Sequence, residues 1–190
     1  MIEHRVGIRL EVDRVEPGDD VEERCRLDVL SWVDSGAALC RTRKPATPVR
    51  HLVSYFVVVD LSRCAVLLVD HRKAQLWLPT GGHVEPGEHP RATVRREAAE
   101  ELGVDARFVS ASGGRPLLLT STVTVGLTAG HTDVGLWYAV DGDADAELRH
   151  DAEEFRAVRW FGFEELARTD PTTLEPNMGR FMAKLAALTR

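Results

Sequence analysis

Three glutamates, Glu97, Glu100 and Glu101, stand in a segment whose residue pattern is helical. Each residue of an α-helix turns by about 100°, so these carboxylates project from nearly the same side of the helix. Like charges at such spacings repel each other, and the repulsion grows where the site is partly buried. A hard divalent cation offsets that repulsion, because Mg²⁺ takes oxygen ligands and shares them with substrate phosphates. The cluster therefore predicts a metal site for phosphate chemistry.

The residues around the cluster fit the same chemistry. Gly81, Gly82 and Gly87 allow the loop before the helix to bend tightly and to approach a ligand closely. A backbone carbonyl of this loop can therefore join the metal ligands. Arg96 precedes Glu100 by four residues and is available as an ion-pair partner or as a hydrogen-bond donor that orients a carboxylate.

The helix that carries the glutamates is predicted over residues 90–102. Pro90 suits its first turn, and a glycine follows its end. Val94, Ala98 and Leu102 are spaced by four, so they line one side of the helix and can be buried against a sheet. The helix is thus anchored by one stripe and carries the glutamates on the next.

Residues 82–104 resemble the Nudix box, G-x5-E-x7-R-E-U-x-E-E-x-G-U, in which U is aliphatic. The required positions are held by Gly82, Glu88, Arg96, Glu97, Glu100, Glu101, Gly103 and Val104, with Ala98 as a small apolar residue at the first U. The fixed letters coincide by chance with a probability of order ~10⁻⁷ per starting point, so the resemblance is specific. It implies an α/β (α+β) fold of the Nudix type, an α/β/α sandwich with a mixed β-sheet.

The resemblance also implies a reaction. Nudix hydrolases use Mg²⁺, with Mn²⁺ as an alternative, while water attacks phosphorus in a phosphoanhydride bond of a nucleoside di- or triphosphate derivative. Carried over by position, the metal ligands are Glu97, Glu100, Glu101 and the carbonyl of Gly81. Glu97 also acts as the general base or orients it, and Arg96 holds a glutamate in place rather than touching the substrate.

Many members of the family place the catalytic base outside the box, on a loop before a late strand. Glu153 and Glu154 precede the strand-like AVRWF, and Glu154 is the preferred candidate. The alternative is a solvated acidic turn in HDAEEF. The intact charges of the box favour an active hydrolase over the competing hypothesis, a non-catalytic Nudix-fold module that senses a nucleotide or regulates through it.

Residues that contact the substrate are predicted from their type and place. His131 and Trp137 lie in segments expected to border the site, and both are candidates for substrate binding. Histidine is a common acid, base and ligand, and tryptophan can stack on a nucleobase. The alternatives are that His131 has no such role and that Trp137 and Tyr138 fill the core. No further recognised motif selects among ADP-ribose, dinucleoside polyphosphates, nucleotide sugars and oxidised nucleotides.

Strands and helices are predicted on both sides of the box. Residues 51–60 and 64–70 form a hairpin of buried strands, residues 117–128 and 134–143 are further strands, residues 155–163 are a strand that leads into a helix, and residues 177–189 are a last helix. Strands and helices mixed in this order predict a sheet covered by helices on both faces.

Residues 1–50 fall outside the resemblance, and we expect an N-terminal, partly helical extension of a Nudix hydrolase domain at 51–190. A helix at about 19–35, capped by one of the two aspartates at its start, either covers the sheet or contributes to a homodimer interface, and the covering role is favoured. Residues 6–12 alternate as a strand does, but a helix stays open. Residues 41–50 are expected to be an extended connector.

Composition narrows the class of protein. Of 190 residues, 44% are hydrophobic and 28% are charged, which is typical of a globular protein. The sequence has neither a long apolar run nor the pattern of a secretory signal, so we expect a cytoplasmic protein without a membrane partner. The net charge of -6 disfavours general nucleic-acid binding but allows a small phosphate-bearing substrate. Three widely spaced cysteines argue against a disulfide framework and a zinc site.

Overall fold

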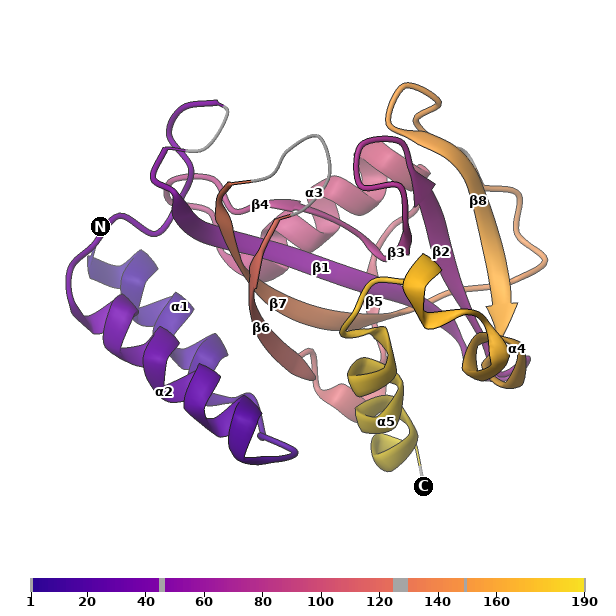
Figure 1. Ribbon diagram of the computed structural model, residues 1–190, viewed down its shortest axis with the longest axis horizontal. Coiled ribbons are helices and arrows are strands. Elements are labelled where there is room, and N and C mark those ends of the chain that lie inside the picture. Colours follow the sequence, from indigo (N-terminus) through magenta and orange to yellow (C-terminus); the bar gives the residue numbers. More distant parts are fainter. Residues whose placement is uncertain (1, 45–46, 125–129, 149, 190) are drawn as a thin grey trace.

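A central strand, β1 (Arg50–Asp60), organises the sheet in the computed structural model, which describes residues 2–44, 47–124, 130–148 and 150–189. It pairs in parallel with β7 (Thr132–Asp141) and antiparallel with β2 (Ala65–His71) and β4 (Thr80–His83). The sheet is therefore mixed, as the sequence predicts (Figure 1).

The remaining strands extend the sheet on both sides. Within the described residues, β3 (Trp77–Leu78) and β8 (Phe155–Gly162) pair with β2, while β5 (Arg107–Phe108) and β6 (Leu118–Val123) pair with β7. The strand expected at 117–128 corresponds to β6, and its residues 125–128 lie outside the described residues.

The β1–β2 hairpin follows from its sequence. Both strands contain runs of apolar residues, and most of their residues are buried on both faces, as in the interior of a covered sheet. The turn between them closes because the Asp60 carboxylate accepts hydrogen bonds from the Ser62 hydroxyl at 2.6 Å and from the Arg63 backbone N–H at 3.1 Å. The predicted hairpin is thereby confirmed.

Helices cover both faces of the sheet (Figure 1). On one face, α1 (Ile2–Asp13), α2 (Asp20–Asp34) and α3 (Pro90–Leu102) share a hydrophobic cluster with β1 and β7. On the other face, α4 (Phe163–Arg168) and α5 (Met178–Leu188) pack into a second cluster, and short 3-10 turns occur at Ser110–Ser112 and Pro171–Thr173. The predicted α/β/α sandwich is thus confirmed. No described helix is long and apolar enough to cross a membrane.

Residues 6–12, for which the sequence allowed either a strand or a helix, belong to the helix α1. Ile8 and Val12, one turn apart, are both fully buried, whereas Val6 and Leu10 are 50% and 49% exposed. The alternation of apolar residues therefore did not mark the buried face, because burial here follows the helical period.

Helix α2 matches the predicted helix closely. Asp19 is its N-cap, and the side chain accepts hydrogen bonds from the N–H groups of Val21 and Glu22, both at 2.9 Å. Val29 and Val33 are fully buried in the cluster that contains β7 residues. The helix therefore covers the sheet, which is the role that the sequence favoured.

A buried hydrogen bond ties α1 to the sheet. Glu11 is only 1% exposed, and its carboxylate accepts a hydrogen bond from the Tyr138 hydroxyl at 2.9 Å. Burial raises the pKa of Tyr138 well above its usual value, and the Glu11 carboxylate adds to that rise. Tyr138 thus fills the core and joins the N-terminal helix to β7.

Candidate active site

Local sequence fixes where the box helix α3 begins and ends. The His89 ring, at the N-cap, accepts a hydrogen bond from the Arg91 N–H at 3.2 Å, and Pro90 occupies the first helical position. Gly103 has a φ of 67°, a left-handed conformation that favours glycine, and it ends the helix. These two ends define the helical segment that carries Glu97, Glu100 and Glu101.

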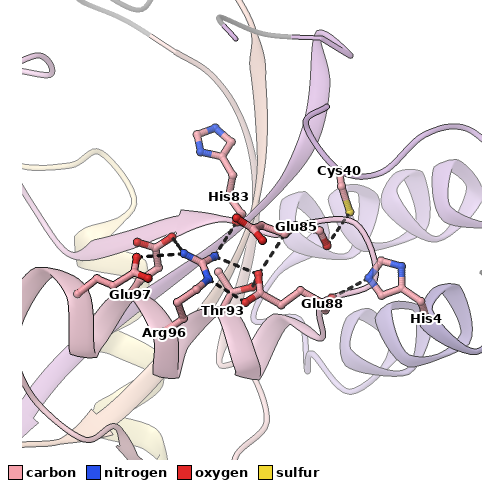
Figure 2. Close-up of polar contacts among 9 residues, drawn as sticks. His4, Cys40, His83, Glu85, Glu88, Thr93, Arg96 and Glu97 are labelled. Carbon is pink, nitrogen blue, oxygen red and sulfur yellow. Dashed lines mark hydrogen bonds and ion pairs between the residues drawn. The ribbon is translucent and has the colours of Figure 1, made fainter. Parts of the chain in front are cut away.

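Arg96 holds the acidic side chains of the box together (Figure 2). Its Nε and Nη2 donate to the two carboxylate oxygens of Glu88 at 2.9 and 3.0 Å. Its Nη1 donates to Glu97 at 2.6 Å and to Glu100 at 3.4 Å, and Nη2 also donates to the His83 carbonyl at 3.2 Å. The guanidinium therefore fixes the loop and the helix in one arrangement, with Glu97 as the residue it orients.

Glu88 joins the loop before α3 to the helix itself. Its carboxylate also accepts from the Thr93 hydroxyl at 2.8 Å and from the Glu85 N–H at 3.1 Å. Partial burial opposes its ionisation, yet these bonds and those from Arg96 leave the pKa of Glu88 below its ordinary value. The backbone carbonyl of Glu88 lies 2.7 Å from His4 Nε2 on α1 (Figure 2), so a helix outside the box supports the loop.

Close packing requires glycine at the first position of the box, Gly82, and at Gly81 just before it. A Cβ on Gly81 would lie 2.5 Å from the Ser54 carbonyl oxygen of β1, and a Cβ on Gly82 would lie 1.8 Å from Glu97 Oε1. The sequence predicted close approach to a ligand at these positions. The structure shows that the chain itself, including a box carboxylate, occupies the space.

Glu97 and Glu101 crowd together in a partly buried site. Burial raises the pKa of Glu97 above its ordinary value, and burial, with Glu97 and Glu154 nearby, raises the pKa of Glu101 to about 9. Among the described residues, the buried Oε2 of Glu101 has no hydrogen-bond partner. This set of crowded, incompletely bonded oxygens fits a hard divalent cation, which would let both carboxylates ionise together.

Glu154, in the turn before β8, lines the same cavity as Glu97 and Glu101. His71 Nδ1 accepts from the backbone N–H groups of Lys73 and Ala74 at 3.2 and 3.1 Å, so the proton is assigned to Nε2, which lies 3.3 Å from Glu154 Oε1. This contact lowers the pKa of Glu154, which stays an ionised acceptor. Glu153, by contrast, is exposed.

A cleft of about 1330 Å³ contains these groups, more than the roughly 300–1,000 Å³ of an ordinary ligand site. Its acidic lining includes Glu97, Glu101 and Glu154, beside Gly81 and Gly82, and its basic lining includes Arg41, Lys44 and Lys73. Glu100 is not among the described lining residues, and its side chain is 60% exposed. The cleft thus combines carboxylates that suit a cation with basic groups that suit phosphate oxygens.

The two candidates for substrate contact fall in different places. His131 lines the cleft, although it is only 8% exposed. Trp137 is 1% exposed and packs between Tyr55 and Phe181, and its Nε1 donates to the Thr120 hydroxyl at 3.0 Å. Trp137 offers no free ring face, so its expected role in substrate binding was wrong, and the alternative core role holds.

Comparison with known proteins identifies the family. Residues 50–185 match the family model described as the NUDIX domain. The chain belongs to the Nudix family. Its match covers the box, all of the strands described above and most of α5.

Relatives and solved structures agree with this placement. The asymmetrical bis(5'-nucleosyl)-tetraphosphatase of Sus scrofa is 35% identical over 89 residues, which are 47% of this chain and 57% of that protein. The chain thus spans little more than half the length of the curated relatives it matches.

Two solved structures share the fold of this Nudix chain. A NUDIX-family hydrolase from Clostridium perfringens superposes with a TM-score of 0.53 at 24% identity, over 74% of this chain and 97% of that one. The NUDIX domain of Shewanella oneidensis NrtR, complexed with ADP ribose, gives a TM-score of 0.57 at 15% identity, over 83% and 92%. At these identities the two structures establish the fold.

Sequence reasoning missed several residues of the cleft. His71 lines the cleft and contacts Glu154, and the completely buried His51, at the start of β1, contacts Asp133 of the cleft lining. One signal was available: His131 and Asp133 are two apart where β7 begins, a spacing that in extended chain puts both side chains on one face. The partners from β1 and β2 carried no local signal, because only the pairing of strands brings them to the site.

Proposed function

We propose that this Nudix protein hydrolyses a phosphoanhydride bond of a nucleoside di- or triphosphate derivative by attack of water at phosphorus. The observation that carries the proposal is the crowded pair Glu97 and Glu101, held at the wall of a large cleft that also presents basic groups. Such a pair is costly without a cation, and a cation there is suited to bind a diphosphate.

The residues that would hold Mg²⁺, or Mn²⁺, are Glu97, Glu101 and the carbonyl of Gly81, with Glu100 contributing from the solvent side. When bound, the ion would supply charge neutralisation at the diphosphate and would acidify the attacking water. This assignment rests on the match to the box and on the oxygen-rich donor set around Gly81.

The protein's own groups then position the reaction. Arg96 orients Glu97 without facing the substrate, since its bonds go to box carboxylates and the loop. Glu154, kept ionised by His71, takes the proton from the attacking water as general base. Lys73 and Arg41 in the cleft lining receive phosphate oxygens of the substrate.

A dinucleoside tetraphosphate is the substrate class we propose to test first. It is taken from the name of the Sus scrofa relative, asymmetrical bis(5'-nucleosyl)-tetraphosphatase, which is 35% identical over 89 residues. The cleft of about 1330 Å³ is large for a single small ligand, which suits an extended polyphosphate.

The test is a hydrolysis assay with Mg²⁺ or Mn²⁺ on a panel that includes a dinucleoside tetraphosphate, ADP-ribose, a nucleotide sugar and a nucleoside triphosphate. Glu97→Gln and Glu101→Gln should each lower kcat/KM by about 100-fold or more, as for groups that position reacting atoms. Glu164→Gln is the matched control, because that carboxylate is 89% exposed on α4. Metal-dependent hydrolysis that survives both box changes contradicts the mechanism, and nucleotide binding without turnover favours the competing sensing module.

A further inference from the structure

A second group of metal-ligating side chains, distinct from the box carboxylates, lies at the cleft: His83, His131 and Asp133 line the cleft, and His51 is completely buried beside them. His51 comes from β1, His83 from the end of β4, Asp133 from the start of β7, and His131 from the residue just before β7. Strand pairing brings them together, because His51 is the register partner of Asp133 and His83 is the register partner of Val53. One nitrogen of each histidine and one oxygen of Asp133 all lie within 4.8 Å of one another.

The hydrogen bonds around His51 leave a lone pair aimed into the group. Its Nδ1 lies 2.8 Å from the Pro48 carbonyl, which can only accept, so Nδ1 carries the proton of the neutral ring. Nε2 is then an acceptor, yet it lies 3.2 Å from the carboxylate oxygen Oδ1 of Asp133, another acceptor. Two acceptors at this distance need something positive between or beside them.

The unpaired atoms converge on one point. Among the described residues, the buried atoms His51 Nε2, His83 Nε2 and Asp133 Oδ1 have no hydrogen-bond partner. His51 is completely buried and Asp133 is 9% exposed, so water does not readily satisfy them. Figure 2 shows that the His83 ring points away from the Arg96 network, although the His83 carbonyl belongs to it. The His83 imidazole therefore takes no part in the Arg96 network, although the residue belongs to the box segment.

We propose that His51, His83, His131 and Asp133 bind a borderline divalent metal ion of the Zn²⁺ type, separate from the Mg²⁺ site of the box. Neutral imidazole and carboxylate are ligands that Zn²⁺ accepts in tetrahedral sites, whereas Mg²⁺ prefers oxygen. This inference stands on the geometry of these four residues and does not depend on the proposed hydrolysis.

Two distances within the group match such a site, and all four ligand atoms lie within 4.8 Å of one another. With Zn–ligand bonds of about 2.0–2.1 Å, the ligand atoms of a tetrahedron lie about 3.3 Å apart. Asp133 Oδ1 lies 3.2 Å from His51 Nε2 and 3.4 Å from His131 Nε2. The ligand residues also make contacts through the atoms that would not bind the metal. His131 Nδ1 lies 3.1 Å from the Thr124 hydroxyl, and the Tyr55 hydroxyl donates to Asp133 Oδ2 at 3.4 Å. Contacts of this kind orient metal ligands.

Four protein ligands leave no open position, so the site is structural. It would join β1, β4 and β7, and β4 carries Gly82, which begins the box, and Gly81 just before it. The bound ion would therefore stabilise the strand on which Gly81 and Gly82 lie.

The test is binding of Zn²⁺ by protein stripped of metal with a chelator, in excess Mg²⁺ to fill the box. We expect one Zn²⁺ per chain, the visible absorption of four-coordinate Co²⁺ on substitution, and a rise in Tm of about 5 °C or more at 100 times the Kd. His83→Gln and Asp133→Asn should each weaken Zn²⁺ binding by about 100-fold or more.

Matched controls separate this site from others. His150→Gln removes an exposed histidine outside the group, and Glu101→Gln removes a box carboxylate, so both should keep Zn²⁺ binding and the Co²⁺ spectrum. His83→Gln is informative even if Asp133→Asn folds poorly, because its Nε2 makes no hydrogen bond within the described residues. The proposal is overturned if the wild-type protein binds no Zn²⁺, or if folded His83→Gln binds it as tightly as the wild type.

Discussion

Replacing Gly82 by alanine should disable the site while leaving the fold nearly intact. Gly82 pairs with Ser54 in the sheet and is not among the glycines with a positive φ, so alanine suits its backbone. The added Cβ, however, would lie 1.8 Å from Glu97 Oε1 and 2.1 Å from its Cδ. The change therefore acts on a carboxylate of the box rather than on the strand.

The expected size follows from that overlap. A carbon and an oxygen that are not bonded stay about 3.3 Å apart, so the Glu97 carboxylate must move by about 1.5 Å. Displacement of about 1 Å at a reacting centre can cost about 100-fold in rate. The movement also breaks the 2.6 Å hydrogen bond from Arg96. We expect kcat/KM to fall by at least about 100-fold, with a stability loss of about 1–2 kcal/mol as side chains adjust.

The assay pairs metal-dependent hydrolysis of the best substrate with thermal unfolding followed by circular dichroism. Gly179→Ala, on helix α5, is the control, because the added Cβ would meet no described atom within 4 Å apart from its chain neighbours and its own helix backbone. That variant should keep full activity and gain up to about 1 kcal/mol. A folded Gly82→Ala protein that retains more than a third of the wild-type kcat/KM would refute the reasoning.

Three further changes test other parts of the site and fold. Arg96→Lys keeps the charge but loses the planar fork of the guanidinium, so kcat should fall by about 10-fold or more in steady-state assays. The same change at the exposed Arg95 is the control and should leave kcat unchanged. Tyr138→Phe removes the hydroxyl that donates to buried Glu11 and should cost about 2 kcal/mol, seen as a fall in Tm of roughly 4–8 °C; an unchanged Tm would contradict this. His71→Gln removes the contact that lowers the pKa of Glu154, so that pKa should rise and the acidic limb of the kcat/KM profile should move to higher pH; an unmoved limb would argue against Glu154 as the base.

The box could be predicted from sequence because its geometry is local. Helical spacing alone places Val94, Ala98 and Leu102 on the buried side, and all three are at most 1% exposed. The predicted role of Arg96 as a support for a glutamate agrees with its contacts to Glu88 and Glu97, although its effect on catalysis stays a prediction.

The histidine group could not be predicted, because it depends on sheet register. His51 and Asp133 are far apart in sequence, and only the parallel pairing of β1 with β7 sets them side by side. The cysteine pattern argued against a zinc site, and that argument says nothing about histidines gathered by strand pairing. Trp137 failed for a related reason: its residue type suits base stacking, but its place in a strand covered on both faces buries it.

The contacts of α1 have a practical consequence for anyone who trims this chain to its family match. A truncated protein beginning at residue 50 would lose His4, whose ring contacts the Glu88 carbonyl, and Glu11, which accepts from Tyr138. It would also expose the apolar surface against which Ile8 and Val12 pack. Such a fragment should aggregate or unfold at lower temperature. Any loss of activity would then reflect the missing support from α1 rather than the absence of a catalytic residue.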